Sequence, residues 1–372
     1  MRLKVFIAIV LRNMLLIISS FLPIKEKLLF ISYSGRNFTC NPRSIYGLIM
    51  QQKKYDSIIV DKSIKKSNNN TTYVKYKSLS FFYQCLTAKV LITNDGFPIF
   101  LPKRKKQILI NTWHGGGAYK KVDPKSKMQK AKYTLLYKDT DFFISSNNIF
   151  THVMSKALGI DEKNFLNIGM PRNDIFFNKL QMINAAGKVK KQLNLKDETV
   201  ILFAPTWRDD GREIIENLTD ENILKAFEKR FNNNVRVLIR AHYHTKNIQS
   251  KNLLDVSSYP DMQELLCAAD ILITDYSSCM WDFSLMYKPC FIYATDIDQY
   301  KQERDFYTPM SEWPFPIAAN NEELVSNIIN FDEAKYIEKV KQHHKALGSY
   351  EDGHSCEKVC KLIADICKVN DK

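Results

Sequence analysis

The sequence predicts an α/β protein built from two doubly wound domains, and three observations lead to this expectation. Short apolar runs typical of buried strands alternate with helical patterns along most of the 372 residues. Such alternation is typical of parallel sheets covered by helices on both faces. The length allows two separate cores, and 45% hydrophobic with 25% charged residues is ordinary globular composition.

The predicted elements follow in chain order. In the first half we expect strands at 28–32, 57–60, 90–93, 108–113 and 142–145, with helices at 43–51 and 78–88. In the second half we expect strands at 199–204, 235–240, 270–274 and 290–294, and helices at 220–231, 261–268, 278–287, 321–330 and 332–346. The polar, lysine-rich stretch 175–197 is the expected connection between the two domains.

Residues 1–24 form an apolar segment, and Arg12 and Asn13 interrupt it near its middle. Charge at that place is costly in a spanning helix and breaks the apolar core of a signal peptide. We expect an amphipathic helix lying in a membrane interface, with basic residues near lipid headgroups: Arg2, Lys4, Arg12, Lys25 and Lys27. The alternative is a helix packed on the protein's own core.

Charge and cysteine content narrow the partners and the compartment. Residues 1–140 hold 26 Lys and Arg against 6 Asp and Glu, a balance of +20, whereas residues 141–372 have a balance of −6. A basic front half suits an anionic partner such as nucleic acid, an anionic membrane or a phosphorylated substrate. The eight cysteines form no C-x-x-C pair, so we expect free thiols in a reducing cytosol and no metal site. No cofactor is evident.

Four polar clusters directly follow predicted strands: "TWHGGGAYKK" (112–121), "PTWRDD" (205–210), "AHYH" (241–244) and "DYSS" (275–278). Ligands of doubly wound sheets bind beyond the carboxyl ends of the strands, so these clusters predict binding or catalysis. The glycine-rich run belongs to no familiar hydrolase, because the chain has no G-x-S-x-G elbow. Dinucleotide and P-loop glycine patterns are also incomplete.

Each cluster has a chemical interpretation and a structural alternative. His114 can serve as a general base near neutral pH, and the glycines next to it let backbone approach a phosphate or an acceptor. Arg208 suits a phosphate, or it pairs with Asp209 or Asp210. The "DYSS" side chains open a helix whose N–H groups bind phosphate, or they simply cap it. His242 faces a ligand or is structural.

Six motifs in this order resemble the CDP-glycerol glycerophosphotransferase family of teichoic acid and capsule synthesis: "TWHG…KK", "GMPRND" (169–174), "APTWRDD" (204–210), "RAHYH" (240–244), "ITDYSS…DF" (273–283) and "ERDFY" (303–307). The resemblance covers roughly residues 25–360. It implies a GT-B-like fold, with an acceptor-binding domain at 25–178 and a CDP-polyol-binding domain at 190–372. The membrane-associating segment 1–24 precedes these domains.

The resemblance also implies the site residues. It assigns His114 and His242 as catalytic and the following as substrate-binding: Gly115, Lys120, Pro171, Arg172, Asn173, Thr206, Arg208, Arg240, Asp275, Ser277, Ser278 and Arg304. The sequence departs from the family pattern in having Gly116, Gly117 and Ala118 after "TWHG", and in having Asp305 and Phe315 where glycine is usual.

The resulting hypothesis is a peripheral enzyme on the cytoplasmic face of a bacterial membrane. It transfers glycerol phosphate, or ribitol phosphate or another polyol phosphate, from its CDP conjugate to a hydroxyl of a lipid-linked or polysaccharide acceptor and releases CMP. Two alternatives stay open: a GT-B glycosyltransferase that uses a nucleotide-sugar, and a nucleic-acid-binding protein that uses the basic front half. The basic runs lack interleaved aromatic residues, so we expect no nucleic acid.

Overall fold

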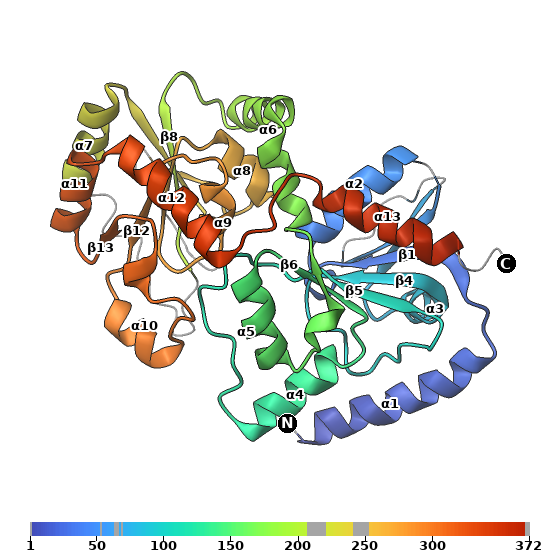
Figure 1. The fold of residues 1–372 in the computed structure, drawn as a ribbon. Coiled ribbons are helices and arrows are strands. Elements are labelled where there is room, and N and C mark those ends of the chain that lie inside the picture. Colours follow the sequence, from blue (N-terminus) through green and yellow to red (C-terminus); the bar gives the residue numbers. More distant parts are fainter. Residues whose placement is uncertain are drawn as a thin grey trace. The chain divides into compact units, whose positions relative to one another are not determined.

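A computed structural model describes residues 2–52, 54–62, 67, 70–206, 221–240 and 253–368. The chain divides into two compact units (Figure 1). Unit 1 consists of Met1–His114, Val122–Asp174 and Tyr350–Lys372, and unit 2 of Gly115–Lys121 and Ile175–Ser349. We predicted a single boundary between 178 and 190, whereas the contacts assign 115–121 to unit 2 and 350–372 to unit 1.

Unit 1 contains a parallel sheet whose strands lie in the order β3-β2-β1-β4-β5-β6-β7. The strands are β1 (Lys25–Ile31), β2 (Asp56–Asp61), β3 (Thr71–Lys75), β4 (Ala88–Thr93), β5 (Ile108–Asn111), β6 (Phe142–Ser145) and β7 (Phe165–Asn167). The helices are α1 (Arg2–Ser20), α2 (Cys40–Gln52), α3 (Leu79–Thr87), α4 (Lys127–Tyr137), α5 (Asn148–Leu158) and α13 (Ser355–Lys368), with 3-10 turns at Tyr33–Gly35, Glu162–Asn164 and Pro171–Phe177.

Unit 2 contains a second parallel sheet, in the order β10-β9-β8-β11-β12-β13. Its strands are β8 (Thr199–Ala204), β9 (Val235–Ile239), β10 (Leu253–Asp255), β11 (Ile271–Thr274), β12 (Cys290–Tyr293) and β13 (Ile317–Ala318). Its helices are α6 (Lys179–Gln192), α7 (Glu221–Phe231), α8 (Met262–Ala268), α9 (Cys279–Ser284), α10 (Ile297–Glu303), α11 (Asn321–Ile329) and α12 (Glu333–Leu347), with a 3-10 turn at Met310–Glu312.

The two sheets repeat one topology. In each, the first strand of the unit lies between the second and the fourth, which is the doubly wound order. The strand order reverses between β1 and β4 in unit 1 and between β8 and β11 in unit 2. These are the two switch points, where a doubly wound sheet binds its ligands.

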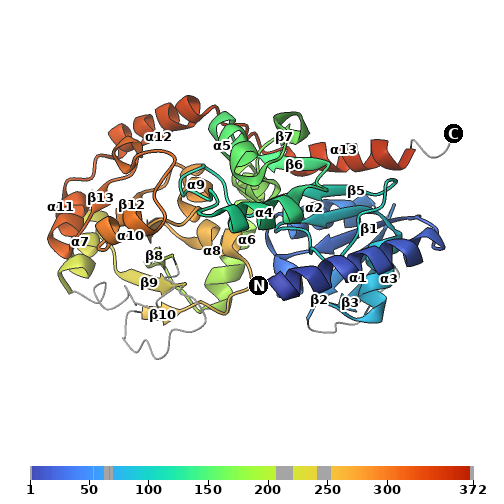
Figure 2. The same ribbon diagram turned by 90° about the horizontal axis from the view of Figure 1, so that it is seen from below.

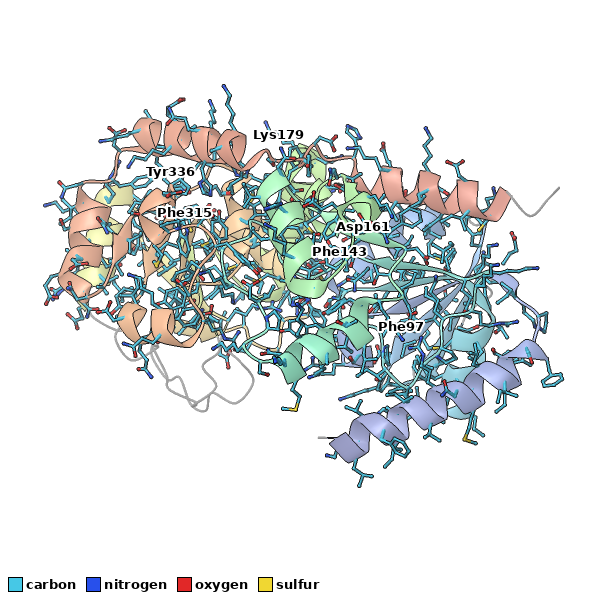
Figure 3. The ribbon with its side chains drawn as sticks, turned by 60° about the horizontal axis from the view of Figure 1, so that its bottom comes forward. Phe97, Phe143, Asp161, Lys179, Phe315 and Tyr336 are labelled. Atoms are coloured by element: carbon cyan, nitrogen blue, oxygen red, sulfur yellow. The ribbon has the colours of Figure 1, made fainter. Side chains whose placement is uncertain are left out.

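Each unit has its own apolar core, as the continuous strand runs predicted. Figure 3 labels Phe97 and Phe143 inside unit 1 and Phe315 and Tyr336 inside unit 2, and all four are at most 3% exposed. Phe315, which stands where the resembling family usually has glycine, therefore fills core volume. Lys179 lies at the start of α6 on the surface.

The stretch 175–197 is not a linker, because most of it is α6. Ala185 and Val189 face the core of unit 2, while the lysines of the helix point outward. Cys356, Cys360 and Cys367 are buried on one face of the C-terminal helix α13. This helix packs on α2, so the chain returns to unit 1 after α12 (Figure 1).

Helix α1 lies along the outside of unit 1, near α3 (Figure 2). One face packs on the unit: Leu15 is buried, and the Arg12 guanidinium pairs with Asp139 at 2.6 Å. Arg12 therefore binds protein, and the expectation that it lies among lipid headgroups is wrong. The segment Leu3–Ser20 is long and apolar enough to cross a membrane by length and composition. Its apolar character extends well beyond the packed face.

Candidate active site

The switch point of unit 1 is closed by a side chain that ties two strand ends together. Tyr33, just after β1, donates its backbone N–H to Oδ1 of Asn94, just after β4, at 2.8 Å. Asn94 is fully buried, and its Nδ2 has no hydrogen-bond partner among the residues that the structure describes. A fixed polar corner therefore stands where ligands of such sheets bind.

His114 joins this corner from the neighbouring strand, β5. Its Nδ1 lies 2.8 Å from the carbonyl oxygen of Asn94. Since a carbonyl only accepts, Nδ1 carries the proton, and in the neutral ring Nε2 is the basic nitrogen. The half-buried ring stacks on Trp113 at 4.6 Å and lies 5.7 Å from the ring of Tyr33. These contacts fix the tautomer and limit rotation of a candidate general base.

The loop that carries His114 is hydrogen-bonded to Asn41, and Asn41 is hydrogen-bonded in turn to the "GMPRND" segment. Asn41 donates from Nδ2 to the carbonyl oxygens of Thr112 and Trp113, at 2.9 and 3.1 Å. The amide of Arg172 donates to Oδ1 of the same Asn41 at 3.0 Å. Trp113 has a φ of +51°, a conformation that costs energy in a residue with a side chain. The strained turn before His114 is thus braced by Asn41.

The predicted substrate-binding residues Pro171, Arg172 and Asn173 are all buried. Asn173 donates to Glu351 at 3.2 Å. The carboxylate of Asp174 accepts from the amides of Ser355 and Cys356, which begin α13. Burial raises the pKa of Asp174, and these hydrogen bonds oppose the rise. In the structure this motif joins the returning C-terminal segment to unit 1.

The glycines after His114 serve packing. A Cβ on Gly116 would lie 2.3 Å from Cδ1 of Trp281, and Gly117 has a φ of +83°. Gly115 is buried as well. Gly116 lies in unit 2, where Trp281 fills the space that its side chain would need. At this position the structure requires glycine for close packing on an indole ring, and the role of Gly115 toward a ligand stays a prediction.

The lysines at the end of the run pair with the "ERDFY" motif. Lys120 forms an antiparallel bridge with Phe306, and the ammonium of Lys121 pairs with the carboxylate of Asp305. Asp305 has a φ of +59°, so the glycine usual in the family would suit this backbone. Its side chain supplies the partner of Lys121, and the hydrogen bond from Lys121 lowers the pKa of Asp305. Arg304 lies beside it at the exposed end of α10.

The switch point of unit 2 is closed by Asp275. The backbone N–H of Thr206, just after β8, donates to Oδ1 of Asp275, just after β11, at 2.8 Å. The same oxygen accepts from the amide of Tyr276, and the carboxylate is fully buried. Arg240 follows β9 at this edge, and its amide donates to the carbonyl of Phe203 at 2.8 Å. Thr206, Arg240 and Asp275 thus share one end of the sheet.

The two serines of "DYSS" stand at the same edge, half-buried. The amides of Met280 and Trp281 already donate to the carbonyls of Ser277 and Ser278, at 3.2 and 3.1 Å. Ser278 is the N-cap of α9, but its hydroxyl makes no capping hydrogen bond. These two amides are therefore engaged, and the amide of Cys279 donates to the Ser277 hydroxyl at 3.5 Å. The binding of an anion by Ser277 and Ser278 stays a prediction.

Arg208 and His242 lie outside the described residues, so their place in the site stays a prediction. Among the parts of the chain that are described, no group of three His, Cys, Asp or Glu residues could hold a metal ion. Sequence reasoning missed Asn94 and Asn41, which position His114. Asn94 directly follows the predicted strand 90–93, so the strand-end rule that found His114 would also have selected it.

Comparison with known proteins decides the family. The model of the CDP-glycerol:poly(glycerophosphate) glycerophosphotransferase family matches residues 14–365. The chain belongs to this family. The predicted resemblance to this family and the predicted class of transferase are thereby confirmed.

The chain is similar in sequence to teichoic acid enzymes of other bacteria, two of which it matches over nearly their whole length. The chain is 31% identical to a teichoic acid poly(glycerol phosphate) polymerase of Bacillus spizizenii over 91% of this chain and 92% of that protein. It is 30% identical to a teichoic acid glycerol-phosphate transferase of Staphylococcus aureus, over 92% and 94% respectively. A polymerase of Staphylococcus epidermidis is 31% identical, but the chain spans about half its length, 50%.

Solved structures confirm the predicted fold class. The chain resembles the wall teichoic acid polymerase TagF soaked with CDPG, with a TM-score of 0.85, 28% identity and coverage of 97% of this chain and 94% of that one. A UDP-N-acetylglucosamine 2-epimerase of Methanocaldococcus jannaschii shares the fold alone, at 12% identity and a TM-score of 0.52. The two parallel sheets of 7 and 6 strands are thus a GT-B-like pair.

Proposed function

We propose that the protein transfers glycerol phosphate, or a related polyol phosphate, from its CDP conjugate to a hydroxyl of a lipid-linked or polysaccharide acceptor. The acceptor oxygen bonds to the phosphorus that carries the polyol, the bond from that phosphorus to the bridging oxygen breaks, and CMP leaves. The observation that carries the proposal is the His114 ring, whose Nδ1 is engaged by Asn94 so that Nε2 is the basic nitrogen. Nε2 would take the proton of the attacking hydroxyl.

Unit 2 supplies the donor site in this proposal. The hydroxyls of Ser277 and Ser278 and the backbone around Thr206 stand at the switch point, which is where such sheets bind nucleotides. Arg240 ends the neighbouring strand. Arg208 and His242, two residues after Thr206 and Arg240 in the sequence, would offset the charge of the transferring phosphoryl group and of CMP.

A donor panel tests the reaction. Full-length protein is incubated with CDP-glycerol, CDP-ribitol and nucleotide-sugars, and nucleotide release is measured with and without an acceptor. We expect acceptor-dependent CMP release from a CDP-polyol. Release from a nucleotide-sugar alone would favour the glycosyltransferase alternative. Salt-dependent retention of nucleic acid on filters, without CMP release, would favour the nucleic-acid-binding alternative.

Donor binding provides a test at the level of single residues. Ser277→Ala and Arg208→Ala each remove a group assigned to a phosphate, and a hydrogen bond to a charged group contributes about 1.5–3 kcal/mol. We expect at least about tenfold weaker CDP-glycerol binding by calorimetry for each variant. Asn330→Ala, at the C-cap of α11, is the control for a general effect of losing a polar side chain. Unchanged affinity in both site variants would remove the site from unit 2.

We also propose that α1 lies on the cytoplasmic face of an anionic membrane. Outside its packed face, α1 has apolar side chains that are 43–70% exposed: Leu3, Phe6, Ile7, Val10, Met14, Leu16, Ile17 and Ile18. Phe21, just after the helix, is 84% exposed. A spanning orientation would break the Arg12–Asp139 pair and expose Leu15. An interfacial orientation keeps both and buries the exposed apolar residues in lipid.

Vesicle co-sedimentation tests this orientation. Full-length protein should pellet with anionic vesicles and detach at high salt, and a chain lacking residues 1–24 should stay in solution. A spanning helix would instead resist salt and require detergent. Equal behaviour of the two chains would show that α1 serves only the protein's own core.

A further inference from the structure

A cavity of about 430 Å³ lies in unit 1, where α1 meets the segment after β4 and the helix α4. This volume falls in the range of small-ligand pockets. Its walls are largely apolar and include Ala8, Phe100 and Leu136. Neither the donor site nor the docking of α1 requires such a space, since Leu15 and Arg12 make the packed contacts of the helix farther along.

Lysines stand at the wall of this cavity on both helices. Lys4 lies one turn before Ala8 on α1, and Lys132 one turn before Leu136 on α4, so each helix presents a cation beside an apolar wall residue. Both lysines are exposed, and neither makes an ion pair or hydrogen bond with any described residue. Their charges are therefore available to an anion.

A third lysine borders the same walls. The ammonium of Lys77 lies 5.5 Å from the ring centre of Tyr76 and 5.4 Å from that of Phe100, and both rings line the cavity. The lysines outnumber the carboxylate of Asp95, which also lines the cavity, so the charge at its walls is positive. Apolar walls with a net positive charge match an anion attached to an apolar chain, because each part finds its own surroundings. A free anion would leave the apolar walls unused, and a neutral lipid would leave the lysines unused.

The cavity is connected to two other parts of unit 1. Its α1 wall belongs to the helix whose opposite side exposes Phe6, Val10 and Ile17. Its inner wall includes Asp95 and Gly96, the residues directly after Asn94, whose carbonyl holds His114. One short segment thus lines the cavity and fixes the candidate base.

From this arrangement we infer that the cavity binds the lipid phosphate of the acceptor, a phosphate carried on a long apolar chain. The inference rests on the proposed function for its link to catalysis. The lysines contact the phosphate, the apolar walls contact the first part of the chain, and the remainder stays in the membrane beside α1. The acceptor hydroxyl is then supplied to unit 1 by a molecule anchored next to His114.

Binding of small probes tests the site on full-length protein in the absence of vesicles. Octyl phosphate carries both an apolar chain and an anion. Octanol carries the chain alone, and inorganic phosphate is the anion alone. We expect one octyl phosphate per protein by calorimetry, with at least about tenfold weaker binding of each single part. Equal binding of octanol would mean an apolar cavity without anion selectivity, and equal binding of phosphate a free-anion site. Either result overturns the inference.

Two lysines on α4 give a matched pair of variants. Lys132→Gln removes a charge from the cavity wall, and Lys130→Gln removes one from the same helix away from the cavity. We expect about five- to tenfold weaker octyl phosphate binding for the first and unchanged binding for the second. Equal loss in both would indicate general surface charge and contradict the site.

Filling the cavity gives a second, independent pair. Ala8→Trp places an indole in the cavity, and Val10→Trp places one on the exposed side of α1. Only the first should abolish octyl phosphate binding, with equal melting temperatures checking that α1 stays docked. If Ala8→Trp undocks the helix, the Lys132→Gln result still decides.

Kinetics separate failure of this inference from failure of the proposed function. Lys132→Gln should raise KM for a lipid-linked acceptor about fivefold while leaving KM for CDP-glycerol and vesicle binding unchanged. An unchanged acceptor KM refutes the link to the acceptor. Absence of CMP release by the wild-type protein with every CDP-polyol refutes the proposed function, while the probe experiment still decides the lipid phosphate site.

Discussion

At both switch points a side-chain oxygen accepts a backbone N–H from the neighbouring strand end, but the side chain is an amide in unit 1 and a carboxylate in unit 2. In unit 1, Oδ1 of Asn94 accepts the N–H of Tyr33 at 2.8 Å, and in unit 2, Oδ1 of Asp275 accepts the N–H of Thr206 at 2.8 Å. Each side chain follows the fourth strand of its unit and ties it to the end of the first. The neutral amide of unit 1 stands beside an imidazole, and the carboxylate of unit 2 shares its sheet edge with hydroxyls and Arg240.

This difference separates what the fold requires from what the reaction requires. The tie between strand ends recurs, so it belongs to the architecture. His114 has no counterpart at this place among the described residues of unit 2, so it belongs to the chemistry. The peptide bond between His114 and Gly115 crosses from one unit to the other. A single sequence motif therefore holds a candidate base on one side and packing glycines on the other.

The largest effect on stability is expected from the two buried histidines of α12, His343 and His344. Burial lowers the pKa of His343 and of His344 to about 4, whereas an unfolded histidine titrates near 6.5. Between these values the unfolded chain binds protons that the folded chain does not, so stability falls as pH drops below 6.5 and is constant above about 7. The loss by pH 4 is on the order of 3 kcal/mol for each histidine.

Denaturant titrations from pH 7 to 4.5 measure this loss. Tyr119 donates to Nε2 of His343 at 3.0 Å, and His343→Gln keeps an acceptor there without the titration. The variant should show a shallower dependence on pH than the wild type. The same slope in both proteins would place the acid sensitivity elsewhere.

Removing one tie sharpens the comparison of the switch points. Asp275→Ala leaves the amides of Thr206 and Tyr276 without their acceptor, at a cost of about 1–3 kcal/mol for each buried group. Asp275→Asn keeps an acceptor oxygen and should lose much less. Equal destabilisation of the two variants, in urea melts, would show that charge rather than the tie holds this corner.

A methyl group tests the packing role of the glycines. Gly116→Ala meets Trp281 at 2.3 Å and should cost about 1–3 kcal/mol through overpacking. Gly187→Ala, on α6 of the same unit, meets nothing within 4 Å and should gain about 0.5–1 kcal/mol from helix propensity. If the Gly116→Ala protein had wild-type stability but bound donor or acceptor more weakly, Gly116 would serve ligand binding and not packing.

The smallest effect is expected at Asp305. Asp305→Gly relieves a positive φ of 59° but loses the exposed pair with Lys121, so the two changes nearly cancel, to within about 0.5 kcal/mol. Asp305→Ala loses the pair and keeps the strain, and should be the less stable of the two. If Asp305→Gly melted at a lower temperature than Asp305→Ala, the positive φ of Asp305 would not be a source of strain.

Strands and helices with strong local patterns were predictable from the sequence. Fully buried runs such as 90–93 and 199–204 are strands in the structure, as their continuous apolar residues indicated. The edge strands β7, β10 and β13 have two or three residues each and give no such pattern. Helix α6 was missed because its lysines dominate the composition, while only Ala185 and Val189 are buried in it.

Long-range connections were not predictable, since no local pattern encodes them. The return of 350–372 to unit 1 includes hydrogen bonds from the start of α13 to Asp174, and the residues joined lie far apart in the sequence, 181 positions for the bond from Ser355. Of the candidate site, the strand-end rule selected His114, Thr206 and Asp275, and the structure places each beyond a strand. It could not show that Gly116 packs against Trp281.

The measurement that tests the central claim most directly is CMP release from CDP-glycerol by His114→Gln, with a melting curve of the same preparation. We predict a rate about 10² to 10⁴ times lower than that of the wild type, because a general base is lost, at an unchanged melting temperature and donor affinity. Gly116→Ala is the control, with a lowered melting temperature and CMP release retained per folded molecule. A His114→Gln rate within threefold of wild type would contradict the assignment of His114 as the base.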